Sequence, residues 1–419
     1  MPQRFVAHYS EVALKGNNRP EFIRALRRNI NRSLSGLDHH TALSEGRFII
    51  DVEGSVEEIA RRLSKVFGVS WFAPVSVVTQ SYPEILSVVL DAPHSVGNHT
   101  FKISARRSDK TFPMTSQELA VRLGAEVSRS TGWSVDLTNP DLSIHVDVVR
   151  GKALVYTDKV RGPGGLPLGT AGRVIHLFSG GIDSPVAAWL IMKRGAKPVY
   201  VHFYLAPTHQ AALDSKITKL VKVLSAYGGK STLVLVPFAE YQLATADVQE
   251  EMEPLLFRRF MRMTCEALAP GFGASAISTG DALSQAASQT LWNIAACDGG
   301  STLPVLRPLL TYDKDEIISF ARRIGTYDIS LEEYKDCCAM ITRHPRTRVK
   351  GSLIDENVRR FGLADLVWKS AERATLVTYN PIGDVLRASP LAESMLMARE
   401  EQGSGDAAGR RGVTLKSKL

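Results

Sequence analysis

The stretch Ser179-Gly180-Gly181-Ile182-Asp183-Ser184-Pro185 decides the fold of this chain. It follows the apolar run 173–178, which has the length of a short buried strand, and precedes 186–194, where apolar residues recur at helical spacing. Ser184 is the expected N-cap of that helix and Pro185 its first residue. A strand, a glycine turn and a helix start direct several backbone N–H groups and a helix dipole at one place, which predicts a phosphate site.

The chain has no G-x-x-x-x-G-K-[ST] sequence, so this stretch is not a Walker A loop. Two adjacent glycines alone could form an ordinary turn, but the full Ser-Gly-Gly-x-Asp-Ser string between a strand and a helix is more specific. It resembles the PP-loop of the ATP pyrophosphatase superfamily, whose members activate a carbonyl oxygen as its adenylate and release pyrophosphate. The alternative for Asp183 is a structural role at the helix start.

Composition sets broad limits on this chain of 419 residues, whose length suggests about two to four domains. Hydrophobic residues make up 44% and charged residues 22%, which allows a sizeable core. No apolar run is long enough to span a membrane and the N-terminus lacks a signal-peptide pattern, so we expect a cytoplasmic protein with no membrane partner. A net charge of +8 fits either an ordinary basic surface or a polyanionic partner.

The four cysteines are Cys265, Cys297, Cys337 and Cys338. They form no C-x-x-C pair and no Cys/His zinc spacing, so the sequence predicts neither a disulfide framework nor a structural metal. Cys265 and Cys297 lie in apolar helical contexts, which favours core packing.

Residues 1–160 read as two small α+β domains, 1–55 and 56–160. The first has a strand, a helix after Pro20 and a second strand; the second has helices beside antiparallel strands. Basic residues mark both domains, and they suit phosphate contacts with RNA or an ordinary solvated surface. They are Lys15 in a glycine loop, Arg24 and Arg28 on one helix face, and Arg106 and Arg107 in an expected loop.

Residues 161–172 carry five glycines and two prolines, a linker composition. From 173 to about 370, strands and helices alternate, which predicts an α/β domain with a doubly wound parallel sheet. Ligands bind such sheets beyond the carboxyl ends of the strands. We therefore expect His202-Phe203, 280–290 and 327–348 around the same crevice, and a partly disordered C-terminal extension over 371–419.

Several stretches together resemble the tRNA uracil 4-sulfurtransferase (tRNA 4-thiouridine synthase) family. The resemblance implies an N-terminal ferredoxin-like domain, a THUMP RNA-binding domain and a PP-loop ATP pyrophosphatase domain. The matching stretches are the lysine-glycine loop near the N-terminus, Phe67-Gly68-Val69, the Gly-Gly-Leu-Pro linker, 280–290, Asp313-Lys314 and Asp336-Cys337-Cys338.

The family resemblance also implies a reaction: conversion of uridine 8 of tRNA to 4-thiouridine. ATP with Mg²⁺ would adenylate the uracil O4, and a cysteine persulfide, supplied by a cysteine desulfurase, would deliver sulfur to C4. The family is linked to thiamine thiazole synthesis as well. An RNA that spans two subunits would favour a homodimer.

The resemblance assigns roles to individual residues. Cys338 matches the catalytic cysteine, Asp183 would orient metal or phosphate, and Lys314 would stabilise phosphate charge, unless it is merely an exposed first-turn lysine. Arg343 and Arg346, beside Cys338, would favour the thiolate and contact RNA. ATP would contact Leu177, Phe178, Ser179, Gly180, Gly181, Asp183, Ser184, His202, Phe203, Arg259, Gly280 and Gln289.

The chain departs from some family members after Cys338, where about eighty residues remain and none is a cysteine. We therefore expect a short form without the rhodanese domain, which weakens the thiamine role. A desulfurase would then load Cys338 directly, and Cys337, Cys265 or an external thiol would resolve the persulfide. The alternatives are another PP-loop enzyme, such as a tRNA 2-thiolase, or a tRNA-binding protein with a vestigial nucleotide site.

Overall fold

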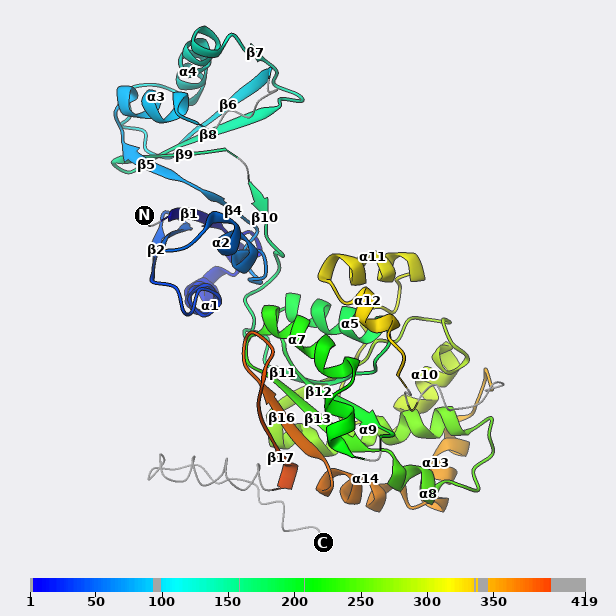
Figure 1. Cartoon of the computed structure of the whole chain (residues 1–419). Coiled ribbons are helices and arrows are strands. Elements are labelled where there is room, and N and C mark those ends of the chain that lie inside the picture. Colours follow the sequence, from blue (N-terminus) through cyan, green and yellow to red (C-terminus); the bar gives the residue numbers. More distant parts are fainter. Residues whose placement is uncertain are drawn as a thin grey trace. The chain divides into compact units, whose positions relative to one another are not determined.

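Three β-sheets organise the part of the chain that the computed structural model describes, two of five strands and one of seven (Figure 1). The described residues are 3–92, 99–157, 159–206, 208–334, 337 and 346–392. Predicted residues Cys338 and Arg343 lie outside them. The chain divides into one unit of residues 1–170 with 193–195 and a second of 171–192 with 196–419. Within the described ranges, no helix has the length and apolar character needed to cross a membrane.

The first half of the first unit is an antiparallel sheet in the order β10-β4-β1-β3-β2, packed against α1 and α2. The apolar stripe Leu26, Ile30 and Leu34 is fully buried in this core, as its helical spacing predicts. Strand β2 was not predicted, because HHTALS has little apolar alternation. The elements are β1 (Gln3–His8), α1 (Arg19–Ser33), β2 (His39–Ser44), β3 (Arg47–Val52), α2 (Val56–Leu63), β4 (Trp71–Pro74) and β10 (Val160–Arg161).

The second half of this unit is a sheet in the order β5-β9-β8-β6-β7 with helices α3 and α4. The capping box of Thr115 and Glu118 is present. The expectation of antiparallel strands is partly wrong, since β6 pairs in parallel with both β8 and β7. Arg106 and Arg107 end β6 instead of lying in a loop. The elements are β5 (Ser76–Thr79), α3 (Tyr82–Leu90), β6 (Thr100–Arg107), α4 (Ser116–Thr131), β7 (Ser134–Val135), β8 (Leu142–Val149) and β9 (Lys152–Tyr156).

The second unit is built on the sheet β15-β14-β11-β12-β13-β16-β17, in which the first five strands are parallel. Its strands are β11 (Arg173–Leu177), β12 (Lys197–Tyr204), β13 (Ser231–Pro237), β14 (Ala274–Ser278), β15 (Val305–Leu306), β16 (Thr375–Tyr379) and β17 (Val385–Pro390). The helices are α5 (Asp183–Lys193), α6 (His209–Leu213), α7 (Lys216–Gly228), α8 (Ala239–Ala244), α9 (Glu253–Phe272), α10 (Leu291–Asp298), α11 (Lys314–Ile324), α12 (Tyr327–Leu331), α13 (Gly351–Arg360) and α14 (Leu363–Glu372).

Helices cover both faces of this sheet, as a doubly wound fold requires. Ile175 and Ile277 pack in the core that contains α9, whereas their neighbours Val174 and Ala276 pack with Ile191 of α5. Adjacent residues of a strand point to opposite faces, so α5 and α9 lie on opposite sides. After β13 the chain returns to place β14 on the other side of β11, which makes the β11–β14 boundary the topological switch point.

The C-terminal part corrects the predicted domain boundary at residue 370. Residues 375–390 form β16 and β17, which extend the sheet beside β13 as an antiparallel edge. This segment was expected to be an extension, partly disordered, yet Val377 and Tyr379 are fully buried. The sheet of the second unit therefore continues past the predicted boundary.

Candidate active site

A cavity of about 330 Å³ opens where β11, β12 and β14 end, at the topological switch point. Segments far apart in the sequence meet there because parallel strands present their carboxyl ends at one edge. Of the predicted nucleotide contacts, the cavity is lined by Leu177, Phe178, Ser179, Asp183, Ser184, His202, Phe203, Gly280 and Gln289.

The PP-loop turns tightly from β11 into α5. Ser184 Oγ donates to Ser179 O at 2.7 Å, and Gly181 N donates to Ser179 Oγ at 3.4 Å. Helix α5 begins at Asp183, so the prediction of Ser184 as N-cap and Pro185 as first helical residue is wrong by two positions. Ser184 is buried in the first turn and fastens the loop instead of capping the helix.

Gly280, after β14, lies against the first turn of α5. A Cβ built on Gly280 would lie 2.9 Å from the backbone nitrogen of Ser184. Any side chain would therefore displace the PP-loop backbone, and this close approach explains the glycine.

Asp183, at the cavity, faces one ammonium group and one amide donor. Lys314 Nζ lies 2.7 Å from Asp183 Oδ1, and Gln285 Nε2 donates to Oδ2 at 2.7 Å. Lys314 is the first residue of α11, whose start is fixed by a capping box of Asp313 and Glu316. Asp183 of the PP-loop and Lys314 of α11 thus place a carboxylate and an ammonium group side by side. Both lie near the backbone N–H groups at the start of α5.

The other side of the cavity is formed by β12 and the loop after β14. His202 Nδ1 lies 2.8 Å from Phe178 O, and its Nε2 lies 2.7 Å from the hydroxyl of Tyr334. Gln289, in the short 3-10 helix Ala287–Gln289, has a buried Oε1 with no hydrogen-bond partner among the described residues. A buried acceptor without a partner at a cavity wall suits a ligand that donates a hydrogen bond.

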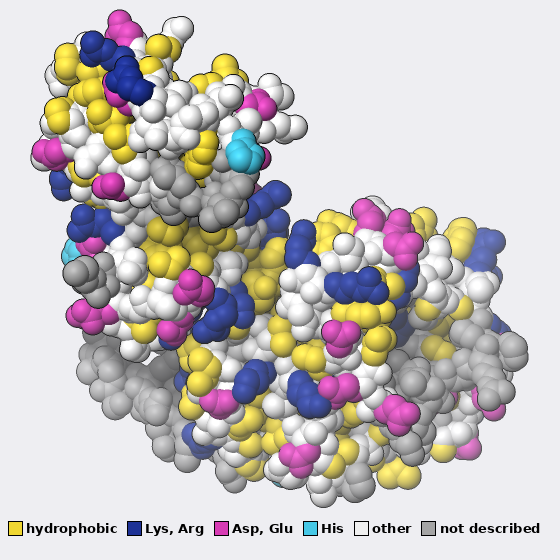
Figure 2. Space-filling model, turned by 45° about the horizontal axis from the view of Figure 1, so that its top comes forward, with side chains coloured by type: hydrophobic (Ala, Val, Ile, Leu, Met, Phe, Trp, Pro, Cys, Tyr) yellow, Lys and Arg dark blue, Asp and Glu magenta, His cyan; other side chains and the backbone are white. Residues whose placement is uncertain are grey.

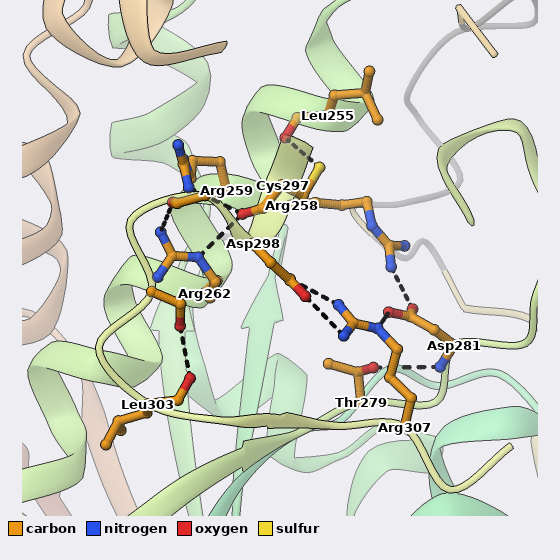
Figure 3. A network of polar contacts seen from close by, with 12 residues as sticks. Leu255, Arg258, Arg259, Arg262, Thr279, Asp281, Cys297, Asp298, Leu303 and Arg307 are labelled. Atoms are coloured by element: carbon orange, nitrogen blue, oxygen red, sulfur yellow. Dashed lines mark hydrogen bonds and ion pairs between the residues drawn. The ribbon is translucent and has the colours of Figure 1, made fainter. Parts of the chain in front are cut away.

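Arg259 does not line the cavity, in contrast to the prediction. It is buried, and its guanidinium pairs with Asp355. The same guanidinium donates to Cys297 O at 3.2 Å (Figure 3). The neighbouring Arg258 lines the cavity, as does Arg307, and the sequence analysis singled out neither. Adjacent residues lie about 100° apart around a helix, so Arg258 and Arg259 point in different directions from α9.

Asp281 is clamped between these two cavity arginines (Figure 3). It pairs with Arg258, and Arg307 Nε lies 3.0 Å from its Oδ2. Arg307 also donates two hydrogen bonds, of 2.9 and 2.8 Å, to the carboxylate of Asp298. Burial alone raises the pKa of Asp281, but the two arginines outweigh it and hold that pKa below its usual value. The clamp fixes the chain directly after Gly280.

Replacing Asp281 by Asn is expected to lower the free energy of unfolding by about 3–5 kcal/mol, because it leaves buried arginine charge uncompensated. Urea denaturation of the purified chain measures this loss. Asp384→Asn is the matched control, since Asp384 pairs with Lys222 at 3.3 Å on the exposed surface and should leave the unfolding midpoint nearly unchanged. Equal midpoints for both variants would contradict a structural role for the clamp.

The three described cysteines are buried. Burial raises the pKa of Cys297 to about 11 and raises that of Cys265 still further, which keeps both as thiols. Cys337 lines the cavity, and its Sγ donates to Phe203 O at 3.2 Å. Core packing of Cys265 and Cys297 agrees with the sequence analysis, although Cys297 also lines the cavity.

The basic residues proposed for RNA contact differ in their surroundings. Arg24 and Arg28 are exposed on α1, and Arg106 is exposed at the end of β6. Lys15 lies over the ring of Phe22 at 5.0 Å, whereas Arg107 donates to Phe112 O and Met114 O at 2.9 and 3.0 Å. In the second unit, Arg346 pairs with Glu251 at 2.5 Å.

The described residues on the face shown in Figure 2 form no single large basic patch. Basic side chains are interspersed with acidic ones over the face shown in Figure 2. The assignment of RNA contacts therefore depends on individual residues.

Among the described residues, no group of three or more His, Cys, Asp or Glu side chains is placed to hold a metal ion. A magnesium ion at this cavity would depend on phosphate oxygens of a nucleotide together with Asp183, as Mg²⁺ commonly does in phosphate sites.

Family models match all three parts of the chain. The model "Thiamine biosynthesis protein (ThiI)" matches residues 169–363, "ThiI ferredoxin-like domain" residues 4–73, and "THUMP domain" residues 85–158. A probable tRNA sulfurtransferase of Moorella thermoacetica is 39% identical over 389 residues, covering 91% of this chain and 99% of the relative. The chain belongs to the tRNA sulfurtransferase family. A probable tRNA sulfurtransferase of Thermus thermophilus is 38% identical, covering 91% and 95%.

A solved structure agrees with this tRNA sulfurtransferase membership. The crystal structure of a 4-thiouridine synthetase–RNA complex with bound ATP is 33% identical, with a TM-score of 0.81, and the match covers 90% of this chain and 100% of that one. These matches confirm the predicted fold: ferredoxin-like, THUMP and PP-loop domains.

Proposed function

We propose that this chain is an ATP-dependent tRNA sulfurtransferase that converts uridine 8 of tRNA to 4-thiouridine. The observation that carries the proposal is the Asp183–Lys314 pair at a PP-loop cavity, in a chain similar along most of its length to a 4-thiouridine synthetase solved with RNA and ATP. A protein that had kept the fold but lost the chemistry would not need this charged pair at the phosphate end.

The residues at the cavity fit ATP. The PP-loop N–H groups and the start of α5 would bind phosphate, and the unpartnered Oε1 of Gln289 would accept a hydrogen bond from the nucleotide. The uracil O4 is a poor leaving group by itself. When ATP adenylates it and pyrophosphate leaves, O4 can depart as part of AMP, which is a good leaving group. Lys314 would stabilise negative charge on the phosphates, and Asp183 would orient Lys314 and a magnesium ion.

Sulfur transfer is proposed to begin at a persulfide on Cys338, loaded by a cysteine desulfurase. The terminal sulfur forms a bond to C4 of uracil as the C4–O4 bond breaks and AMP leaves. A second thiol then attacks the Cys338 sulfur, forms a disulfide with it and releases the thiocarbonyl. Cys337, which lines the cavity, or an external thiol suits this second role better than Cys265, which does not line the cavity and whose pKa is raised by burial.

RNA binding is proposed to use the exposed arginines of α1. The double variant Arg24→Ala with Arg28→Ala is expected to weaken tRNA binding and to reduce the slope of log K against log[salt] by up to about 1.8, because each lost phosphate contact removes about 0.9. Filter binding over a salt series measures this slope. Arg359→Ala with Arg360→Ala, two exposed residues of α13, serves as the control. An unchanged slope in the α1 variant would assign its arginines to ordinary surface.

The proposed activity is tested by reconstitution. The purified chain is incubated with unmodified tRNA, Mg-ATP, a cysteine desulfurase and cysteine, and digested tRNA is analysed by chromatography and mass spectrometry. We expect 4-thiouridine at position 8. Formation of 2-thiouridine would favour the other PP-loop thiolases, and tRNA binding without either product would favour a vestigial site.

A further inference from the structure

Asn293, the third residue of α10, is fully buried and uses its side-chain amide on three sides. Its Nδ2 donates to Ala287 O at 2.7 Å and to Arg346 O at 2.8 Å, and its Oδ1 accepts from Val349 N at 3.0 Å. Because two carbonyls face the amide nitrogen and an N–H group faces the amide oxygen, the side chain has one workable orientation. Such a saturated buried amide is costly to disturb.

These hydrogen bonds join two segments that are distant in the sequence. Ala287 lies between Ala286 and Ser288, which line the nucleotide cavity. Residues 346–349 are the described residues that follow the two adjacent cysteines. Asn293 therefore connects the cavity loop to the first described residues that follow the cysteines, 346–349.

Thr290 reinforces the same connection. Its Oγ1 caps α10 by accepting from Asn293 N at 3.3 Å, and it donates to Thr347 O at 2.8 Å. The guanidinium of Arg348 lies 4.0 Å from the ring centroid of Trp292, a cation–π contact. The start of α10 thus holds residues 346–349 at several points.

The chain ahead of Cys338 is fixed to the cavity by β12. Tyr334 contacts His202, and Cys337 donates to Phe203 O, with both partners lining the cavity. Both described flanks of the cysteine segment are therefore attached to elements that form the nucleotide site.

We infer that Asn293 is a positioning residue for the sulfur-transfer step. By joining the cavity loop to residues 346–349, it fixes the described residues on the C-terminal side of the cysteines to the nucleotide cavity, and small misplacements of reacting groups slow a reaction strongly. The inference rests on the proposed function, since it takes Cys338 as the sulfur carrier. The charged groups proposed for adenylation, Asp183 and Lys314, are not among the partners of the Asn293 side chain, so at saturating ATP the loss of Asn293 should slow sulfur transfer more than adenylation.

The variant Asn293→Asp tests this inference with almost no change in shape. It replaces the amide nitrogen by an oxygen that would face the carbonyls of Ala287 and Arg346, so both hydrogen bonds that connect the two segments are lost. With saturating tRNA and ATP, we expect tRNA-dependent pyrophosphate release within about threefold of the wild type and 4-thiouridine formation slower by about 10- to 100-fold. Asn357→Asp is the control, because its amide donates to Leu353 O within α13, and both rates should stay near wild type.

The pH profile becomes informative when thiolation is compared with pyrophosphate release in the same variant, because a general loss of structure would lower both rates together. The new buried carboxylate would have a raised pKa, and its protonated form could donate one of the two lost hydrogen bonds. The thiolation rate of Asn293→Asp relative to wild type should therefore rise as pH falls. A ratio that does not change with pH would contradict the proposed hydrogen-bond role.

Thr290→Val and Thr290→Ser provide a second test if Asn293→Asp fails to fold. Valine removes the hydroxyl that donates to Thr347 O, so this variant should show the same separation of rates to a smaller degree. Serine keeps the hydroxyl and should retain the wild-type thiolation rate. Thiolation at the wild-type rate in Asn293→Asp, or an equal fall of both half-reactions in both Asn293→Asp and Thr290→Val, would overturn the inference. Absence of 4-thiouridine with the wild-type chain would overturn the proposed function, and this inference with it.

Discussion

Replacing Cys338 by Ser is expected to eliminate 4-thiouridine formation while tRNA-dependent pyrophosphate release continues. A serine hydroxyl cannot carry the transferable sulfur of a persulfide, so the loss should exceed about 10³-fold, the scale reported for removal of an essential nucleophile. Cys265 and Cys297 cannot take its place readily, because burial raises the pKa of each thiol and little thiolate forms near neutral pH. Rapid-quench assays of both products measure the two half-reactions.

The matched control for this prediction is Cys337→Ser. Its hydroxyl can still donate to Phe203 O, as the Cys337 thiol does at 3.2 Å, so the local structure should persist. If Cys337 is a structural neighbour, this variant keeps most of the thiolation rate. Loss of thiolation in both variants identifies Cys337 as the resolving thiol. Product formation by Cys338→Ser together with loss in Cys337→Ser would transfer the carrier role to Cys337 and contradict the prediction.

Local signals in the sequence predicted the elements that build the cavity. The apolar run before Ser179 is β11, and the helically spaced residues after Pro185 belong to α5. A capping box at Asp313, visible in the sequence itself, starts α11. Each of these signals depends on residues within a few positions of one another, such as hydrophobic spacing and side-chain caps. For this reason the sequence alone predicts the PP-loop, His202 and Gly280 at the cavity, and the structure places them there.

Features that depend on distant partners could not be predicted in the same way. Strands β16 and β17 extend the sheet because β16 pairs with β13, and nothing within residues 375–390 specifies that partner. The parallel pairing of β6 with β8 is likewise a choice between two distant segments. Arg259 was predicted and Arg258 was missed because which of them faces the cavity depends on the direction in which α9 packs.

Replacing Asp183 by Asn is expected to slow pyrophosphate release and thiolation together by about 10²–10³-fold, the scale of losing one preorganised electrostatic group. The Asp183 carboxylate lies 2.7 Å from Lys314 Nζ and accepts from Gln285 at 2.7 Å, so it fixes the ammonium group beside the PP-loop. Asparagine keeps the size of the side chain but removes the charge that pairs with Lys314 and that would attract the proposed magnesium ion. Single-turnover pyrophosphate release measures the loss.

The control for Asp183→Asn is tRNA affinity, together with the variant Asp315→Asn. Affinity should stay within about twofold, because the proposed RNA contacts on α1 belong to the other unit of the chain. Asp315 follows Lys314 in the first turn of α11 and is exposed, so its loss tests for a general effect of removing a carboxylate near that helix start. If Asp183→Asn weakens tRNA binding, or lowers thermal stability as strongly as activity, Asp183 acts in shaping the start of α5 instead of in adenylation.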